Sequence, residues 1–168
     1  EIPLRLVGSE MCIRDRILAT YFKVDAVINT GIAGSLRAEI NIGDVVLSTD
    51  ALQHDMDATN FGYEPGVIPG MKVSTFKASE ELIEKAEKAC KREVPELGVF
   101  KGRVVSGDQF VSDKATKNRI ADTFHGYCTE MEKCESENPR FVVCGGTGSA
   151  YNDADGSATG HQRFDFPV

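Results

Sequence analysis

Val24-Asp-Ala-Val-Ile-Asn29 is an apolar run that closes at Thr30-Gly31. A short apolar run bounded by a turn signal is typical of a buried parallel strand. Val45 to Leu47 is a second run of this kind, and Val99 to Val105 is a third, which ends at Ser106-Gly107-Asp108. Together these runs predict a sheet whose strands lie largely parallel.

Two amphipathic helices are predicted among these strands. The first begins after Ser79, which can cap it, and Pro95 stops it. It carries one apolar stripe, and glutamate–lysine pairs four residues apart lie on its solvated side. The second spans Asp113 to Phe124 and is capped by Ser112. Its inward-facing residues are Ile120, Ala121 and Phe124. Strands that alternate with helices predict an α/β fold.

Composition narrows the functional class. At 168 residues and 41% hydrophobic, the chain suits one globular domain. Its 19 basic and 26 acidic side chains give a net charge of −7, which argues against nucleic acid or an anionic membrane as partner. The cysteines are odd in number and lack a C-x-x-C spacing, so we expect reduced thiols. With no long apolar segment or leader recognisable, the prediction is a cytoplasmic protein.

The two ends of the chain differ from its middle. Leu6-Val-Gly-Ser-Glu-Met-Cys-Ile-Arg-Asp-Arg16 resembles translated sequencing adapter, so residues 1–16 are interpreted as a non-native scar or a disordered arm. Residues 17–132 form the predicted core. Residues 133–168 are interpreted as a disturbed C-terminal part of the same domain, in which Phe141 to Cys144 has strand composition and Gly145 to Asn152 has turn composition.

A stiff aromatic loop follows the second strand. It reads Asp55-Met-Asp-Ala-Thr-Asn-Phe-Gly-Tyr-Glu-Pro-Gly-Val-Ile-Pro-Gly70. Pro65 and Pro69 restrict its backbone, and the loop carries the aromatic residues Phe61 and Tyr63. Such a loop can cover an apolar ligand or dock on a partner subunit. Alternatively, its aromatics fix it to its own core.

Three strand exits carry residues suited to ligand binding, which in open α/β sheets occurs beyond the carboxyl ends of the strands. Thr30 to Gly34 holds glycines that allow close approach to backbone N–H groups, although a tight turn would also use them. In Ser106-Gly-Asp-Gln-Phe-Val111, Phe110 is either a ligand contact or core. In Glu130-Met131-Glu132, alternate carboxylates share one face of a strand and could accept ribose hydroxyls, unless they are merely solvated.

In order and spacing, the loop and these exits resemble those of the 5′-methylthioadenosine/S-adenosylhomocysteine nucleosidases, within the nucleoside phosphorylase superfamily. The resemblance covers about residues 17–132. It implies a three-layer nucleoside-phosphorylase-like α/β fold with a central mixed, largely parallel sheet, incomplete at both ends. It also implies hydrolysis of the N-glycosidic bond of both nucleosides with release of adenine, as in methionine salvage, and no cofactor.

The resemblance assigns purine and ribose contacts to the first two exits. Ala33 and Gly34 border the ribose and base, while Ile32 stands where a small residue is frequent. Phe110 stacks on the purine, and the main chain of Val111 reads its edge. Backbone N–H and C=O groups can distinguish adenine by its pattern of donors and acceptors.

The third exit and the loop complete the substrate-binding residues implied by the resemblance. Glu132 accepts the ribose 2′- and 3′-hydroxyls, Met131 supplies an apolar and main-chain contact, and Glu130 lies in the same set. The loop from Phe61 to Pro69 lies across a two-fold interface in the family and walls the neighbour's alkylthio pocket. A homodimer is therefore implied.

The catalytic residues are matched less well. Departure of adenine requires a proton at N7, which a carboxylic acid with a raised pKa can deliver. The family carries this acid in S-D-x-A-D after an arginine, whereas this chain has Asn152-Asp153-Ala154-Asp155-Gly156 without that arginine. Asp153 is the candidate acid and Asp155 the second choice. The family's water-activating glutamate has no match before Ile17, so the general base is missing.

Three alternatives remain at this point. A purine nucleoside phosphorylase would need arginines for phosphate, and Arg37 is the only one near the first glycine pair. A catalytically dead nucleoside-binding fragment would fit the missing base. A metal site at His54, Asp55 and Asp57 would have a poor ligand set, so no metal is expected.

Overall fold

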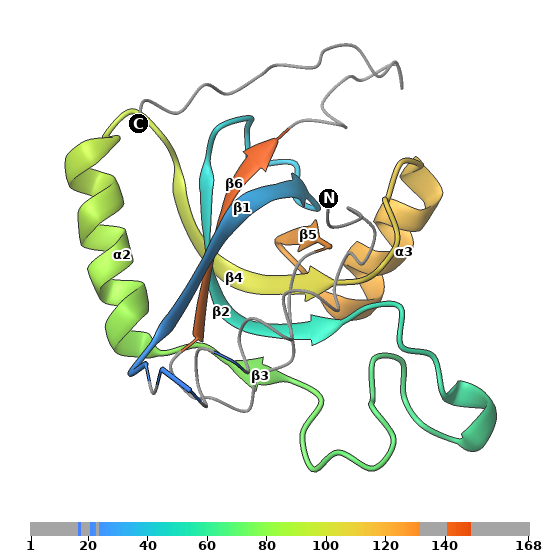
Figure 1. The fold of residues 1–168 in the computed structure, drawn as a ribbon. Coiled ribbons are helices and arrows are strands. Elements are labelled where there is room, and N and C mark those ends of the chain that lie inside the picture. Colours follow the sequence, from blue (N-terminus) through green and yellow to red (C-terminus); the bar gives the residue numbers. More distant parts are fainter. Residues whose placement is uncertain (1–16, 18–20, 23, 132–140, 149–168) are drawn as a thin grey trace, which may run out of the picture.

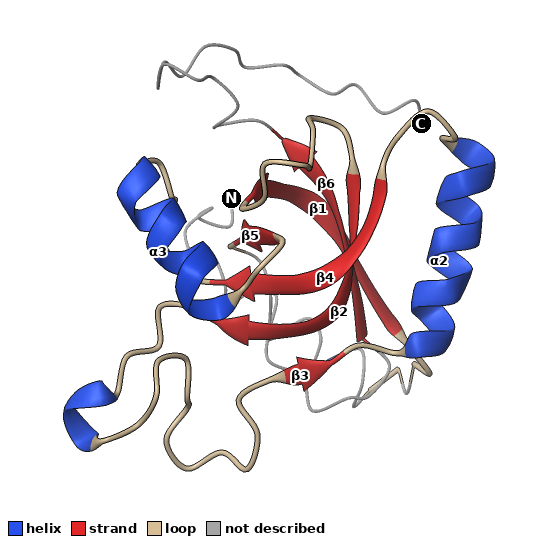
Figure 2. Cartoon of the chain, turned by 180° about the vertical axis from the view of Figure 1, so that it is seen from behind, coloured by secondary structure: helices blue, strands red, loops and turns tan. Residues whose placement is uncertain are grey.

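The structure is a computed structural model that describes residues 17, 21–22, 24–131 and 141–148. The elements are β1 (Val27–Ser35), β2 (Val45–Gln53), the 3₁₀ turn η1 (Thr59–Phe61), β3 (Phe76–Lys77), α2 (Glu80–Glu93), β4 (Val99–Ser106), α3 (Lys114–Phe124), β5 (Cys128–Glu130) and β6 (Phe141–Gly148). Helices α2 and α3 lie on opposite sides of a strongly curled sheet (Figure 1 and Figure 2). No helix within the described ranges is long and apolar enough to cross a membrane.

The described strands form one sheet in the order β3-β2-β4-β5-β1-β6, and β6 pairs again with β2. The second pairing closes five of the strands into a ring, with β3 outside it. The long ladders, β1 with β6 and β2 with β4, are parallel. The antiparallel ladders of β1 with β5, β2 with β3 and β2 with β6 are short. The predicted mixed, largely parallel α/β sheet is therefore confirmed.

Three apolar clusters give the fold its layers. Val46 and Leu47, which are neighbours in β2, belong to different clusters because successive strand residues point to opposite faces. The strand cluster consists of Ala33, Ile40, Val46, Val104 and Cys128. The α3 cluster consists of Leu36, Leu52, Val105, Val111, Ile120 and Phe124. The α2 cluster is centred on Leu47 and Ile83. Each helix thus covers its own part of the sheet.

Both predicted helices form, with corrected caps. Ser79 occupies the N-cap of α2, but its side chain makes no capping hydrogen bond. The second helix begins one residue later than predicted, and its cap is Asp113, whose carboxylate accepts from the Thr116 N–H at 2.8 Å. The prediction that Ser112 caps this helix was wrong. The Asp113 carboxylate, three residues before that N–H group, satisfies the exposed donor in its place.

The glycine-rich ends of β1 and β6 differ from the sequence prediction. Strand β1 continues through Thr30-Gly31 to Ser35, and β6 continues through Gly145 to Gly148. These stretches pair with each other in parallel register, Gly31 with Gly145 and Gly34 with Gly148. Backbone pairing between distant segments therefore overrides the local turn composition. The first strand was also predicted to be buried, whereas Ile28 is 60% exposed.

The described parts of the termini are short. The Tyr21 N–H donates to the Ile17 carbonyl at 2.9 Å, an i to i−4 bond like that of a helix end. Residues 1–16, 132–140 and 149–168 lie outside the described residues. The interpretations of residues 1–16 as a scar and of the segment after Gly148 as disturbed sequence therefore remain predictions.

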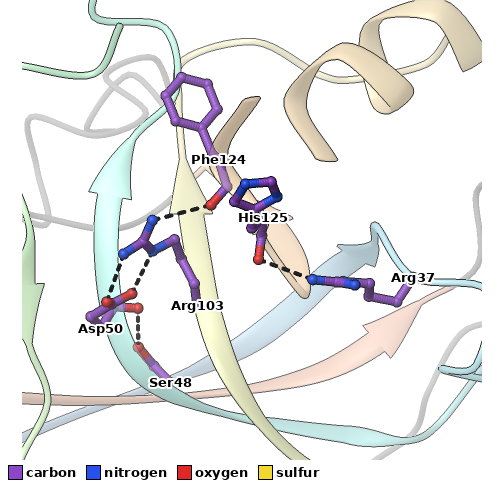
Figure 3. Close-up of polar contacts among 6 residues, drawn as sticks. All are labelled: Arg37, Ser48, Asp50, Arg103, Phe124 and His125. Carbon is purple, nitrogen blue, oxygen red and sulfur yellow. Dashed lines mark hydrogen bonds and ion pairs between the residues drawn. The ribbon is translucent and has the colours of Figure 1, made fainter. Parts of the chain in front are cut away.

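A half-buried arginine ties β2, β4 and α3 together (Figure 3). The Arg103 guanidinium donates to both carboxylate oxygens of Asp50, at 2.7 and 2.9 Å, and to the Phe124 carbonyl at the end of α3, at 3.1 Å. The hydrogen bonds that Arg103 donates to the Asp50 carboxylate raise the pKa of Arg103. The Arg103 carbonyl accepts the Tyr127 N–H at 2.8 Å, just before β5. One residue therefore fixes both the end of α3 and the start of β5.

We expect Arg103→Lys to destabilise the fold, because one ammonium cannot reproduce the bidentate pair and the bond to Phe124. The loss should be about 1.5–3 kcal/mol, the range for hydrogen bonds to charged groups. Arg92→Lys is the control, since the Arg92–Glu93 pair is exposed on both sides and should contribute almost nothing. Urea unfolding of both variants measures the difference, and equal small changes would show that the Arg103 network is not a principal support.

Candidate active site

The carboxyl ends of three parallel strands meet at one edge of the sheet. Gln53 at the end of β2 lies beside Ser106 at the end of β4, which in turn lies beside Glu130 at the end of β5. The residues that follow these positions are His54, Gly107 and Met131. Two of the three strand exits chosen from the sequence, those after β4 and β5, are therefore adjacent.

Strand β1 brings the first glycine pair to the same edge. It runs antiparallel to β5, with Gly34 opposite Thr129 and Ser35 opposite Cys128. Ala33 precedes Gly34 in β1, and Glu130 follows Thr129 in β5. A Cβ on Gly34 would make ordinary contact with the Thr129 side chain at 3.6 Å, so space within the described residues does not by itself require glycine here. The structure thus places Ala33 and Gly34 beside the Glu130–Met131 exit.

Backbone hydrogen bonds fix the turn after β4 from two sides. The Gly107 N–H donates to the Glu130 carbonyl at 3.2 Å, and the His54 N–H donates to the Ser106 carbonyl at 2.8 Å. The Asp108 N–H donates to the Asp55 carboxylate at 2.7 Å. The ends of β2 and β5 therefore both hold this turn, and the segment that carries Phe110 leaves the sheet from a defined position.

The two residues expected to contact the purine differ from each other in exposure. Phe110 is 72% exposed, so the alternative that its ring is ordinary core is wrong. The Val111 side chain is 7% exposed and packs in the α3 cluster. An exposed aromatic ring next to an anchored backbone offers an open face for stacking and main-chain groups for hydrogen bonding.

The acidic exit is described only in part. Glu130 ends β5 and is 7% exposed, and the half-buried Met131 lies beyond the strand. Glu132 lies outside the described residues, so the predicted shared face of the two carboxylates stays a prediction. Burial, together with the charge of Glu130, raises the pKa of the Cys128 thiol to about 12. Cys128 is therefore a neutral packing residue near pH 7.

Of the three residues considered for a metal, Asp55 and Asp57 form other hydrogen bonds and His54 is buried. The Asp57 carboxylate accepts from the backbone N–H and the hydroxyl of Thr59, at 3.0 and 2.6 Å, at the start of η1. Asp55 holds the turn after β4. His54 is 3% exposed, and neither of its ring nitrogens has a hydrogen-bond partner in the described part of the chain. Burial lowers the pKa of His54, although Asp55 opposes this, so the imidazole is neutral near pH 7.

The aromatic loop is anchored at its base and exposed at its tip. Gly66 is buried, has a left-handed φ of 81°, and packs so closely on Phe124 that a Cβ would lie 3.0 Å from the ring. Phe61, by contrast, is 84% exposed and Tyr63 is 42% exposed. The alternative that these aromatics fix the loop to its own core is therefore wrong. Figure 1 shows η1, which contains Phe61, on a loop that projects from the sheet.

The remaining predicted site residues lie outside the described residues, and the roles of two described residues were not predicted. Asp153 and Asp155 lie outside the described residues, like Glu132. From the sequence, His54 and Asp55 were considered only as possible metal ligands, whereas in the structure both contact the turn after β4. Their position directly after an apolar strand, opposite another strand exit, was the signal that could have identified them.

Comparisons with known proteins place this arrangement in a family. The family model described as "Phosphorylase superfamily" matches residues 7–134. The 5′-methylthioadenosine/S-adenosylhomocysteine nucleosidases of Bacillus thuringiensis (strain Al Hakam) and Bacillus anthracis (strain A0248) are each 44% identical over 117 residues, which are 69% of this chain and 50% of the relative. The chain thus spans about half the length of these curated relatives.

Solved structures agree with this result. A 5′-methylthioadenosine/S-adenosylhomocysteine nucleosidase from Colwellia psychrerythraea, in complex with adenine, superposes with a TM-score of 0.76 at 29% identity, covering 84% of this chain and 61% of that one. Futalosine hydrolase of Helicobacter pylori superposes with a TM-score of 0.76 at 26% identity, covering 84% and 62%. The family match contains the aromatic loop and all three strand exits, and the curled sheet is shared with the nucleosidases. This chain belongs to the phosphorylase superfamily.

Proposed function

We propose that the protein hydrolyses the N-glycosidic bond of 5′-methylthioadenosine and S-adenosylhomocysteine and releases adenine. The observation that carries this proposal is the convergence of β1, β4 and β5 at one edge, where backbone hydrogen bonds hold the turn that leads to Phe110. The 44% identity to nucleosidases of this name supports the substrate class. Because the chain spans half of those relatives, the activity is assigned to the whole protein.

The substrate would lie across the three strand exits. Its adenine stacks on the exposed ring of Phe110, and the main chain at Val111 reads the purine edge. Ala33 and Gly34 border the ribose, and Met131 packs against it. Glu132 is the proposed acceptor of the 2′- and 3′-hydroxyls, because a carboxylate forms strong charge-assisted hydrogen bonds to such donors.

Bond cleavage requires an acid and an activated water. Asp153 is the proposed acid at adenine N7, with Asp155 as the second candidate, because a carboxylic acid near the leaving base can protonate it as the bond to C1′ lengthens. The sequence has no match to the water-activating glutamate of the family. We propose that this group lies in an N-terminal strand–loop element of the whole protein.

Water, rather than phosphate, is the proposed nucleophile. A phosphorylase needs arginine side chains directed at a phosphate oxyanion. Arg37 donates instead to the His125 carbonyl at 3.3 Å (Figure 3) and to the Gly126 carbonyl at 3.2 Å. Its guanidinium also lies 4.9 Å from the centre of the Tyr127 ring. These contacts hold the corner between α3 and β5 and disfavour the phosphate-dependent alternative.

The proposal extends to the setting and the assembly of the protein. The net charge of −7 disfavours a nucleic-acid or anionic-membrane partner, and a cytoplasmic setting is proposed from the cysteine pattern. The exposed Phe61 and Tyr63 support a homodimer through the loop from Phe61 to Pro69, because apolar surface of this kind is usually covered by a partner.

Adenine release tests the function directly. We expect the 168-residue chain to release adenine from methylthioadenosine slowly, because general acid and general base steps each contribute roughly 10²–10⁴-fold. A longer form that carries a G-x-x-x-A-M-x-x-E-like element before residue 17 should release it rapidly and without phosphate. Chromatography of adenine with and without phosphate measures both. Strict dependence on phosphate would establish the phosphorylase instead, and failure of both forms to bind or cleave the nucleoside would favour a non-nucleosidase role.

The ribose contact is tested by two neighbouring carboxylates. In the longer form, Glu132→Gln should lower kcat/KM by about 10–150-fold, since hydrogen bonds to charged groups contribute roughly 1.5–3 kcal/mol. Glu130→Gln, the control, should have a smaller effect, because both ribose hydroxyls are assigned to Glu132 and the Glu130 side chain is only 7% exposed. Steady-state kinetics of both variants decide the assignment, and similar mild effects would remove Glu132 from the ribose site.

The dimer is tested at the exposed loop. Phe61→Ala should weaken dimerisation and the binding of methylthioadenosine together, because one ring is proposed to contact both the partner and the alkylthio group. Phe22→Ala is the matched control, since Phe22 is 70% exposed but lies outside the loop. Sedimentation of the longer form, with binding of methylthioadenosine and adenosine, gives both readouts. A stable monomer that still prefers the methylthio nucleoside would contradict the shared interface.

A further inference from the structure

His54 is packed beneath the turn that follows β4. It is the first residue after β2 and is 3% exposed. A Cβ atom on Gly107 would meet the ring nitrogen Nε2 and would lie 2.6 Å from Cε1. The imidazole therefore lies directly against the backbone of Gly107, and it leaves no room there for any side chain. Since φ at Gly107 is not positive, space and not backbone conformation explains this glycine.

The turn cannot easily move away from the imidazole. The Gly107 N–H is bonded to the Glu130 carbonyl at 3.2 Å, and the Ser106 carbonyl is bonded to the His54 N–H at 2.8 Å. The Asp108 N–H is bonded to the Asp55 carboxylate at 2.7 Å. These bonds fix the turn to the ends of β2 and β5, and the imidazole packs against the side of Gly107 where a side chain would lie. The opposing contacts together define its position.

The chemistry of His54 also calls for an explanation. A neutral imidazole has one N–H donor and one acceptor nitrogen. In the described part of the chain neither has a partner, and burial of unsatisfied polar atoms is unfavourable. An apolar side chain would fill the same volume without that penalty. The imidazole is flat, and its edge packs against the backbone of Gly107. We take this packing as the reason for a histidine here.

We propose that His54 is a positioning residue for the purine, and that its imidazole, packed under Gly107, sets the depth of the turn that carries Phe110 and Val111. The proposal rests on the proposed function, since adenine is taken to bind that turn. Protein interiors are closely packed, so a change in the support is transmitted to the backbone above it. A misplacement of about 1 Å near a reacting ligand can lower the catalytic rate roughly 100-fold.

Adenine binding by the 168-residue chain, measured by isothermal titration calorimetry, tests the proposal. His54→Ala should weaken adenine binding by about tenfold or more, because the turn loses its support. Ile83→Ala is the control for general destabilisation, since Ile83 is 7% exposed but belongs to the α2 cluster. It should lower Tm and leave the adenine affinity of the folded protein unchanged. Equal affinities for His54→Ala and Ile83→Ala would overturn the proposal.

A pair of variants tests the contact without any ligand. Gly107→Ala should lower Tm by roughly 4–8 °C, as expected for overpacking in a domain of this size. In the His54→Ala background the same substitution should cost much less, because the added methyl enters the space left by the imidazole. The double variant should also bind adenine more tightly than Gly107→Ala alone. Additive Tm losses would overturn the steric contact.

These readouts separate the two levels of the inference. If the unsubstituted chain binds no adenine while the Tm cycle shows coupling, the contact stands, but the purine assignment and the positioning role fail with it. If the unsubstituted chain binds adenine and His54→Ala binds it equally well, the proposed function stands and the role of His54 is wrong.

Discussion

The parallel register of β2, β4 and β5 is the constraint on which the candidate site depends. Val45 starts beside Val99, and after the register shift between Ser48 and Ala51 the strands end with Gln53 beside Ser106. The parallel ladder between β4 and β5 in turn places Ser106 beside Glu130. Without this register, three elements far apart in the sequence would not share one edge. The ion pair between Arg103 and Asp50 lies at the shift, so it stabilises the alignment where the ladder is interrupted.

The closure of the sheet explains why glycine-rich sequence serves as strand. Strand β6 pairs with β1 over its whole length and with the first residues of β2. Two such glycine stretches can approach each other and still form a full ladder. The edge of β1 that carries Ala33 and Gly34 is therefore held by backbone pairing with β6 and β5. A site bordered by small residues and anchored backbone suits a neutral ligand that is recognised by main-chain groups.

Local sequence patterns predicted which helices and strands form better than they predicted the residues at which these begin and end. The apolar stripe and charge pairs of α2 and the run from Val99 to Val105 were sufficient, because these features act over a few residues. The strand nature of Gly145 to Gly148 could not be predicted locally, since it depends on pairing with β1. For the site, resemblance selected the exits after β4 and β5. The position of His54 under Gly107 was not predictable, because it arises from two strand ends that meet only in the fold.

The central claim is that adenine binds at the edge formed by the ends of β2, β4 and β5. The most direct measurement is the change in backbone amide chemical shifts of the 168-residue chain as adenine is added. We expect the amides of Gly107, Val111 and Met131 to shift together with one dissociation constant, while those of α2 stay unchanged. Shifts confined to α2 or to the loop around Phe61, with none at Gly107 and Val111, would contradict it.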